Sequence, residues 1–573
     1  MNLKHWNWVF VAILTLAALG GAGFLAYRTV YYQTAYIQPQ ETGNYLPTLA
    51  PRLIFVIVDG LPYPLAAQLS SMQQVAKRGA AAKSISVIPS MSQPTWTALV
   101  TGARPEINGA ALFNAEGDAI TTIQVDHLFA LVKQTRRVTA LAGQEWWRRM
   151  IPAEFVDRAH FVPEFDAAGD AEATQAAIDF VHDPEVGFLL LYLGDYDELS
   201  DTLGPSGAET QRALQRTDKN LTALLEQVDW SDTVVAIAAD HGQLPQGGHG
   251  GDDPSVLETL FVIAGPRVRQ GSFGTIQQPD IAATLSALLG LSLPRSGQGR
   301  ILYELLDASP FEQARGQVAL VAQSIVQADA YLRSIKGDAV PAGLRDQTVK
   351  LGALLQSAKT DEVDRLANSL VDHIRLYVEQ TRSERDRQGR LARLPLALVG
   401  WALVVVTFAT DWHRGHRAPL LLALLGVGAQ HAFWIVRGHV YSLSTLSSAD
   451  GTTNLAITLV GGALISLTLG LLLLAPLAWL RGRRPASYSY RDSFFVYCAG
   501  VTGFLFAVGL AAYVVNSGLG SWYLVVPRLA FLTLLSWVQT ALAGVLSLFG
   551  FGLTGLAGLL LRRRAALPED ARR

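Results

Sequence analysis

The residues that could do chemistry occur in four short motifs between positions 51 and 305. Asp59 ends an apolar run in VDG, Ser92 and Thr95 lie in SMSQPTWTALVTG, Asp197 and Asp201 lie in GDYDELSD, and Asp240, His241 and His249 lie in ADHGQLPQGGHGG. Carboxylates and imidazoles beside a hydroxyl form a ligand set for two divalent ions, which suits displacement at phosphorus. Each residue alone has an ordinary structural explanation, because Asp-Gly is common in turns and Ser and Thr cap helices. The ordered set predicts a phosphoester as the substrate.

Buried strands must position these motifs. Apolar runs without polar alternation predict such strands at residues 52–60, 187–193, 233–239 and 260–264, and helical stretches occur at 209–228 and 280–289. Strands that alternate with helices indicate an α/β fold with a mostly parallel sheet covered by helices on both faces. Three of the four runs end in an acidic or acid-histidine motif, and ligands of such sheets gather at the carboxyl ends of the strands.

The order of the motifs resembles that of the alkaline phosphatase superfamily. The matching segments are VDG, SQPTWTALVTG, D-x-x-x-D-x-x-G-P, DHGQLPQGGHGG and DIAATLSALLGLSLP, over about residues 51–305. Within the superfamily, the chain looks most like the nucleotide pyrophosphatase/phosphodiesterases and the GPI ethanolamine phosphate transferases. The transferases are also similar in layout, with one N-terminal span, an extracytoplasmic catalytic domain and a multi-span tail. The resemblance implies a phosphodiesterase or a phospho-headgroup transferase.

The resemblance also implies roles for individual residues. By this resemblance, the ligands of a first metal ion are Asp59, Ser92, Asp240 and His241. The ligands of a second metal ion are Asp197, Asp201 and His249. Ser92 would be the nucleophile that forms a covalent phosphoseryl-type intermediate, with Thr95 as the alternative nucleophile. Thr95 otherwise stands in the place of an Asn that helps to bind a phosphoryl oxygen.

Two departures from the family pattern affect these expectations. The family usually has His where this chain has Asp201. Two Zn²⁺ ions are implied by the resemblance, but the extra carboxylate shifts the second site toward Mn²⁺, Mg²⁺ or Ca²⁺. This altered site motivates an alternative, a catalytically weak binding or assembly protein. A sulfatase is a further alternative, because SQPTW resembles S-x-P-x-R, although Trp96 stands where the Arg should be.

The composition excludes a purely soluble protein. Of 573 residues, 50% are hydrophobic and only 16% are charged, against about 25% charged in ordinary soluble domains. The net charge of -2 argues against nucleic acid as a partner. Residues 8–27 form an uncharged run long enough to span a bilayer, with a cleaved signal peptide as the alternative. Further apolar runs follow at 394–410, 419–436, 455–480, 494–515 and 529–561, the last being one or two membrane segments.

Arginine clusters predict the topology. Six spans place all three clusters on one side of the membrane: Arg414 and Arg417, then Arg481, Arg483, Arg484 and Arg491, then Arg562, Arg563 and Arg564. Cytoplasmic loops are enriched in Lys and Arg, so both termini are expected in the cytoplasm and residues 28–393 outside it. The predicted parts are an anchor (1–30), a catalytic domain (51–309), a helical stalk or cap (310–392) and a membrane domain (393–564). Membrane spans before and after the catalytic domain would hold its site near lipid headgroups, which favours a lipid or glycolipid phosphoester as the substrate. The sequence leaves the oligomeric state open.

Two further motifs receive structural interpretations. Trp146 and Trp147 are expected to be a partly buried aromatic pair, and headgroup binding is the alternative. Arg104 and Asn108 follow the nucleophile segment and are expected in a turn, with a place at the rim of the site as the alternative.

Overall fold

The computed structural model describes residues 6–30, 34–40, 45–110, 114–447, 449–481, 490–516 and 527–565. The chain divides into two compact units, each of which is described by itself. The sheet unit consists of Val30–Arg387 and Leu443–Gly451. The helical unit consists of Met1–Thr29, Gln388–Ser442 and Thr452–Arg573.

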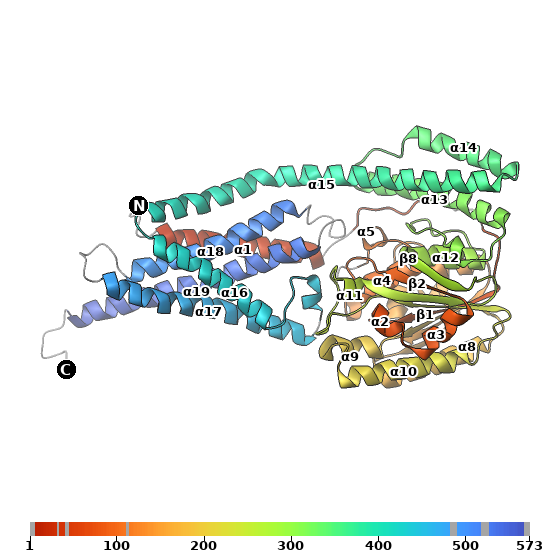
Figure 1. The fold of residues 1–573 in the computed structure, drawn as a ribbon, viewed down its shortest axis with the longest axis horizontal. Helices are drawn as coiled ribbons and strands as arrows, with labels where there is room; N and C mark the ends of the chain where they lie inside the picture. The colour runs from red at the N-terminus through yellow and green to blue at the C-terminus, as the bar shows by residue number, and fades with distance from the viewer. Residues whose placement is uncertain are drawn as a thin grey trace. The chain divides into compact units, whose positions relative to one another are not determined.

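An eight-stranded sheet forms the centre of the sheet unit, in the order β4-β3-β5-β1-β6-β7-β2-β8 (Figure 1). In chain order the strands are β1 (Arg52–Val58), β2 (Ala80–Ile85), β3 (Val138–Gln144), β4 (Arg158–Val162), β5 (Val186–Leu193), β6 (Thr233–Ala239), β7 (Glu258–Ala264) and β8 (Gly271–Gln277). Strand β7 is antiparallel to both of its neighbours, and the other pairs are parallel. The four strands expected from the apolar runs are β1, β5, β6 and β7, so the predicted α/β fold is confirmed.

The central strands are apolar on both faces because each face is covered by helices. In β1, Leu53, Phe55 and Ile57 belong to one hydrophobic core and the alternating Ile54, Val56 and Val58 to the other. Successive side chains of a strand point to opposite faces, so an uninterrupted apolar run fits a strand buried on both sides.

One core lies under helices that follow the strands on that side of the sheet. These helices are α4 (Ser92–Thr101), α6 (Leu128–Gln134), α7 (Trp146–Met150), α12 (Pro279–Leu289) and α13 (Pro310–Ser334). The other core lies under α2 (Tyr63–Ala66), α3 (Ser70–Arg78), α8 (Ala167–Val181) and α10 (Ala208–Leu225). Shorter helices near the strand ends are α5 (Pro105–Asn108), α9 (Asp195–Leu203) and α11 (Pro254–Leu257).

The polar helical stretch after residue 310 packs on the first core. Its helices are α13, α14 (Ala342–Gln356) and the first part of α15 (Thr360–His413), which runs on into the helical unit. Ser309 caps α13 with a capping box, in which the side chains of Ser309 and Glu312 bond to each other's backbone N–H. Leu320, Val321 and Leu370 are buried in the core, so these helices pack as part of the sheet unit.

The helical unit is built from long apolar helices. Besides the end of α15, they are α1 (Trp6–Val30), α16 (Arg417–Val436), α17 (Ala449–Arg481), α18 (Tyr490–Val515) and α19 (Pro527–Ala565). Among the described residues, six helices are long and apolar enough to cross a membrane. The chain is therefore an integral membrane protein, and the last apolar run is a single helix, α19. Of the arginine clusters, Arg483 and Arg484 lie outside the described residues.

Candidate active site

The four sequence motifs meet at one edge of the sheet. Asp59 directly follows β1, α9 with Asp197 and Asp201 follows β5, and Asp240 and His241 directly follow β6. Strands β5, β1 and β6 are adjacent and parallel, so their carboxyl ends lie side by side. The sheet topology explains why residues about 180 positions apart in the chain come into contact.

Backbone hydrogen bonds hold Asp240 in place. Its Oδ1 accepts from the N–H of Gly60 at 3.0 Å and from the N–H of His241 at 2.7 Å. Gly60 has a φ of 67°, a conformation that favours glycine, and a side chain here would collide with Asp197. The turn after β1 therefore requires a glycine in VDG.

Ser92 begins α4 and lines a cavity of about 350 Å³. Its Oγ lies 3.3 Å from Nε2 of His241 and accepts a hydrogen bond of 3.1 Å from Nδ2 of Asn114. The partial positive charge at the N-terminus of a helix favours negative charge at this position. The hydroxyl thus lies where a phosphoryl group could meet both a nucleophile and hydrogen-bond donors.

Thr95 lies one turn further along α4 and does not line this cavity. Its hydroxyl is completely buried and lies 3.0 Å from Oδ2 of Asp240 and 2.8 Å from the carbonyl oxygens of Met91 and Ser92. Thr95 is therefore placed to hold Asp240, whereas the side-chain amide beside the Ser92 hydroxyl belongs to Asn114.

The two histidines stack on each other, with ring centroids 3.9 Å apart. Nδ1 of His241 lies 3.1 Å from the carbonyl oxygen of Gly242, and Nδ1 of His249 lies 2.9 Å from that of Ser90. A carbonyl oxygen only accepts, so each Nδ1 carries a hydrogen and each Nε2 is left for another partner. In metal sites, a carbonyl oxygen that accepts from Nδ1 in this way fixes the orientation of an imidazole whose Nε2 binds the metal.

Carboxylate oxygens face these Nε2 atoms. For His241, Oδ1 of Asp59 lies at 3.2 Å and Oδ2 of Asp240 at 3.4 Å. For His249, Oδ2 of Asp201 lies at 3.5 Å. A lone pair of nitrogen facing a carboxylate oxygen is repulsive unless positive charge lies between them, so the arrangement requires protons or metal cations at these atoms.

The pKa shifts show how strongly the site attracts positive charge. Burial and the neighbouring Asp240 raise the pKa of Asp59, and burial together with Asp59 and Asp201 raises that of Asp197. Burial acts to lower the pKa of His249, but the carboxylates of Asp201 and Asp197 outweigh it and raise that pKa. The protein alone therefore leaves the acids poorly compensated.

Two groups of three side chains have geometry suited to metal ions. In each group the ligand atoms lie within 4.8 Å of one another, and the groups are Asp59, Asp240 and His241, and Asp197, His241 and His249. The buried Oδ1 atoms of Asp59 and Asp201 have no hydrogen-bond partner among the described residues, which leaves them free for a cation. The donor set of oxygen and imidazole nitrogen atoms fits divalent metals.

Aromatic rings form one wall of the cavity, and acids line its rim. Trp96 stacks on Trp147 at 5.3 Å, and Trp146 meets Phe165 at 5.0 Å. Trp147 is buried in the core, whereas Trp146, Trp96 and Phe165 line the cavity together with the acids Glu116 and Glu198. Trp146 thus lines the cavity and also packs against the ring of Phe165.

A short segment between two helices of the membrane tail completes the site. Residues 443–451 belong to the sheet unit, and Ser447 lines the cavity. The Ser447 hydroxyl accepts a hydrogen bond of 2.7 Å from the N–H of His249, and Oγ of Ser444 accepts one of 2.9 Å from the N–H of Gly251. The loop that carries His249 is thereby fixed from outside the catalytic segment of the chain.

Several of these contacts were not predicted from the sequence. Asn114, Ser444 and Ser447 stand in segments without a strand-end motif, so no local signal marked them. Tyr192 donates a hydrogen bond to Oδ2 of Asp59, and its position near the end of the apolar run of β5 was the one available signal. Asn108 bonds to Ala103 and Ala110 and has the expected turn role.

Comparisons with known proteins agree with this geometry. Residues 53–262 match the model of the family described as type I phosphodiesterase / nucleotide pyrophosphatase. GPI ethanolamine phosphate transferase 2 of Aspergillus fumigatus is 24% identical over 328 residues, which cover 52% of this chain and 42% of that protein. The catalytic subunit of human GPI ethanolamine phosphate transferase 3 is 24% identical over 259 residues, 43% of this chain and 23% of that protein.

The chain thus spans less than half the length of these curated relatives. Among solved structures, human ectonucleotide pyrophosphatase / phosphodiesterase 5 aligns with a TM-score of 0.39 at 14% identity, over 45% of this chain and 100% of that one. The family match coincides with the strands and motifs that build the site. Over residues 53–262 the chain is therefore similar to the type I phosphodiesterase / nucleotide pyrophosphatase family of the alkaline phosphatase superfamily.

Proposed function

We propose that this protein is a membrane-bound, metal-dependent enzyme that cleaves a phosphodiester and passes the phosphoryl-bearing group through Ser92. The observation that carries the proposal is the position of the Ser92 hydroxyl, at the start of a helix, in a cavity, 3.3 Å from His241 and 3.1 Å from Asn114. The matches to phosphodiesterases and to ethanolamine phosphate transferases support the same reaction class.

The metal-binding residues follow from the two groups of acids and histidines. Asp59, Ser92, Asp240 and His241 would hold one divalent ion, and Asp197, Asp201 and His249 the other, with His241 close to both groups. When bound, two such ions supply positive charge that lowers the pKa of the Ser92 hydroxyl and offsets the charge of the phosphoryl oxygens. The extra carboxylate of Asp201 favours a hard ion such as Mn²⁺, Mg²⁺ or Ca²⁺ over Zn²⁺ at the second site.

The protein residues then account for the two displacements. Oγ of Ser92 forms a bond to phosphorus, the bond to the leaving alcohol breaks, and that alcohol departs with a proton. The Asn114 side-chain amide and the N-terminus of α4 stabilise the developing negative charge. Water or a second alcohol then attacks phosphorus and releases Ser92, so the acceptor alone separates a hydrolase from a transferase.

The cavity wall suits a positively charged headgroup. Trp146 and Phe165 offer aromatic faces, with the buried Trp96 behind them, and Glu116 and Glu198 offer carboxylates. An ammonium group is attracted to both kinds of surface. We therefore propose an ethanolamine-phosphate-like headgroup on a lipid or glycolipid as the substrate, as the names of the matched transferases suggest.

We also propose that the sheet unit lies outside the cytoplasm and that both termini lie inside it. The support is the placement of arginines beside the apolar helices, together with the six helices able to span a membrane. A site on the outer side of the membrane would meet headgroups of the outer leaflet.

The test of the proposed reaction uses the full-length protein in detergent with a generic aryl phosphodiester and added Mn²⁺ or Zn²⁺. We expect turnover by the wild type and none by Ser92→Ala, and mass spectrometry of trapped enzyme should find the phosphoryl adduct on Ser92. Thr95→Val should turn over more slowly but still form its adduct at Ser92, because Thr95 bonds to Asp240 rather than lining the cavity.

An adduct on Thr95 would overturn the choice of nucleophile. No turnover by either the wild type or Ser92→Ala would instead favour the alternative of a binding or assembly protein. Adding an alcohol such as ethanolamine to the assay separates the two enzyme classes, because a transferase yields a product that contains the acceptor.

A further inference from the structure

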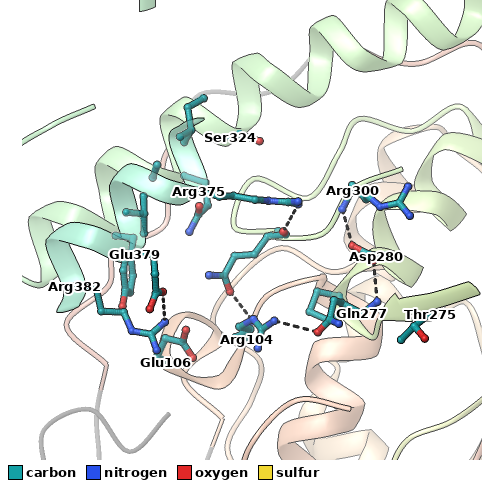
Figure 2. A pocket seen from close by; sticks show the side chains of 18 residues that line it. Arg104, Glu106, Thr275, Gln277, Asp280, Arg300, Ser324, Arg375, Glu379 and Arg382 are labelled. Atoms are coloured by element: carbon teal, nitrogen blue, oxygen red, sulfur yellow. Dashed lines mark hydrogen bonds and ion pairs between the residues drawn. The ribbon is translucent and has the colours of Figure 1, made fainter. Parts of the chain in front are cut away.

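A second cavity, of about 460 Å³, lies in the sheet unit, and Figure 2 shows the side chains that line it. None of its lining residues lines the cavity of Ser92. Its walls come from α5, β8, α12, α13 and α15, so helices of the polar stretch after residue 310 form one side of it. Arg104, at the start of α5, follows the far end of α4, a helix about 14 Å long at 1.5 Å per residue.

Four arginines line this cavity, and two of them have a carboxylate partner. Arg300 donates from Nη1 to Glu304 at 2.9 Å, and Arg382 lies 3.2 Å from Glu379. Arg104 and Arg375 form no ion pair with any described residue. Arg375, which is exposed, donates to the carbonyl oxygen of Gln298 at 3.1 Å (Figure 2), and most of its five N–H groups have no partner among the described residues.

The acids of the cavity do not neutralise these two guanidinium groups. Asp280 already accepts hydrogen bonds from the N–H groups of Gln277 at 2.9 Å and Arg300 at 2.8 Å. Glu106 is buried, and burial raises its pKa, which weakens its negative charge. Arg375 lies within electrostatic range of the carboxylates of Asp280 and Asp372 as well as of the like charges of Arg300 and Arg104, but among the described residues it forms no ion pair with either acid.

A further donor lies in the same cavity without a partner. Nε2 of Gln327, on α13, is buried and bonds to no described residue, and the Gln327 side chain is only 8% exposed. An unpaired buried amide is costly in a folded protein and marks a place where a ligand or water is expected. Ile374 and Val378 add apolar surface beside it.

We propose that this cavity is a binding site for an organic phosphate. Arginine forks match phosphate oxygens with paired hydrogen bonds, and the Gln327 amide adds a neutral donor. The volume of about 460 Å³ exceeds that of a bare phosphate ion and leaves room for an attached organic group against Ile374 and Val378. The site is independent of the reaction proposed for Ser92.

The test measures binding of radiolabelled glycerol 3-phosphate to full-length protein in lipid-free detergent by equilibrium dialysis. With divalent metals removed by chelation, so that the acidic cavity of Ser92 does not attract phosphate, we expect one bound equivalent in the wild type and at least tenfold weaker binding in the Arg104→Gln/Arg375→Gln variant. The matched control is Arg365→Gln on α15, an exposed arginine that lines neither cavity and donates to the Asp361 carbonyl oxygen. It should bind like the wild type.

Thermal unfolding shows whether a loss of binding in the double variant is due to misfolding of that variant. The double variant should unfold no earlier than the wild type without ligand, because it removes two like charges that form no ion pair among the described residues, and glutamine can still donate hydrogen bonds to Gln277 and Gln298. Glycerol 3-phosphate should raise the unfolding temperature of the wild type more than that of the variant. Equal binding by both proteins would overturn the proposal, as would a variant that unfolds early while ligand leaves the wild type unchanged.

A second experiment distinguishes a lipid headgroup from a soluble molecule as the natural source of the bound phosphate. Full-length protein in nanodiscs of phosphatidylglycerol is compared with protein in nanodiscs of phosphatidylcholine. A lower affinity for glycerol 3-phosphate in phosphatidylglycerol alone, absent in the double variant, would identify a lipid headgroup. The same affinity in both membranes would identify a soluble phosphate, and no binding in either would overturn the proposal.

Discussion

Asp201 is the side chain that most distinguishes this site from the pattern of its superfamily. Its Oδ2 lies 3.5 Å from Nε2 of His249, so a histidine at this position would present a second imidazole to the same ion. Nitrogen ligands suit zinc better than oxygen ligands do. We expect Asp201→His to shift the relative affinity toward Zn²⁺ over Mg²⁺ on the order of tenfold, about 1.4 kcal/mol.

Elemental analysis after dialysis against equal concentrations of both metals measures this shift. Glu198→His, on the same helix but in neither group of ligand atoms, is the control and should leave the metal ratio unchanged. An unchanged ratio in Asp201→His would show that the Asp201 carboxylate does not ligate a metal.

At the scale of single elements, the histidine that caps α6 makes the stability of the folded protein depend on pH. Nδ1 of His127 accepts the N–H of Ala130, and burial lowers the pKa of His127 to about 4. Between about pH 6.5 and 4 the unfolded chain binds a proton that the folded chain does not, so stability falls as the pH falls through this range. The full effect is roughly 3 kcal/mol for a difference of about 2.5 pKa units.

His127→Asn keeps a side-chain acceptor at the cap but does not titrate. We expect its unfolding temperature to decline less between pH 7 and 4 than that of the wild type, as measured by differential scanning fluorimetry. Parallel declines in both proteins would show that the imidazole of His127 is not buried in its neutral form.

The loop of residues 443–447 gives a second prediction at this scale. Ser447→Ala removes the acceptor of the His249 N–H. Loss of a group that orients a metal ligand typically costs about 10- to 100-fold in metal affinity. Metal titration should therefore show weaker binding at one of two sites, and Ser447→Thr, which keeps the hydroxyl, should restore it. Wild-type affinity in Ser447→Ala would show that the loop does not position His249.

The elements of the sheet were predictable, whereas parts of the site were not. Apolar runs such as that of β5 are local, and the motifs directly after β1 and β6 follow from the topology of parallel sheets. The Ser447 contact joins residues 198 positions apart through a loop without periodicity. Asn114 stands 22 residues after Ser92 with no motif of its own, so only the fold reveals that it meets the hydroxyl.

For the whole molecule, the orientation in the membrane can be tested with cysteines. The only native cysteine, Cys498, is buried, so it gives little background. In intact cells we expect a membrane-impermeant maleimide to label Arg365→Cys, in the sheet unit, but not Arg414→Cys, between two apolar helices. Labelling of Arg414→Cys alone would reverse the proposed topology.

The loop that carries Ser447 also sets an order of events during synthesis. His249 leaves the ribosome 198 residues before Ser447, which at about 5–20 residues per second is a delay of roughly 10 to 40 s. The apolar helix α16 is translated within that interval. A nascent chain therefore completes this pocket only after the apolar end of α15 and the whole of α16 have been made, so the order of synthesis links the last part of the site to the first helices of the membrane tail.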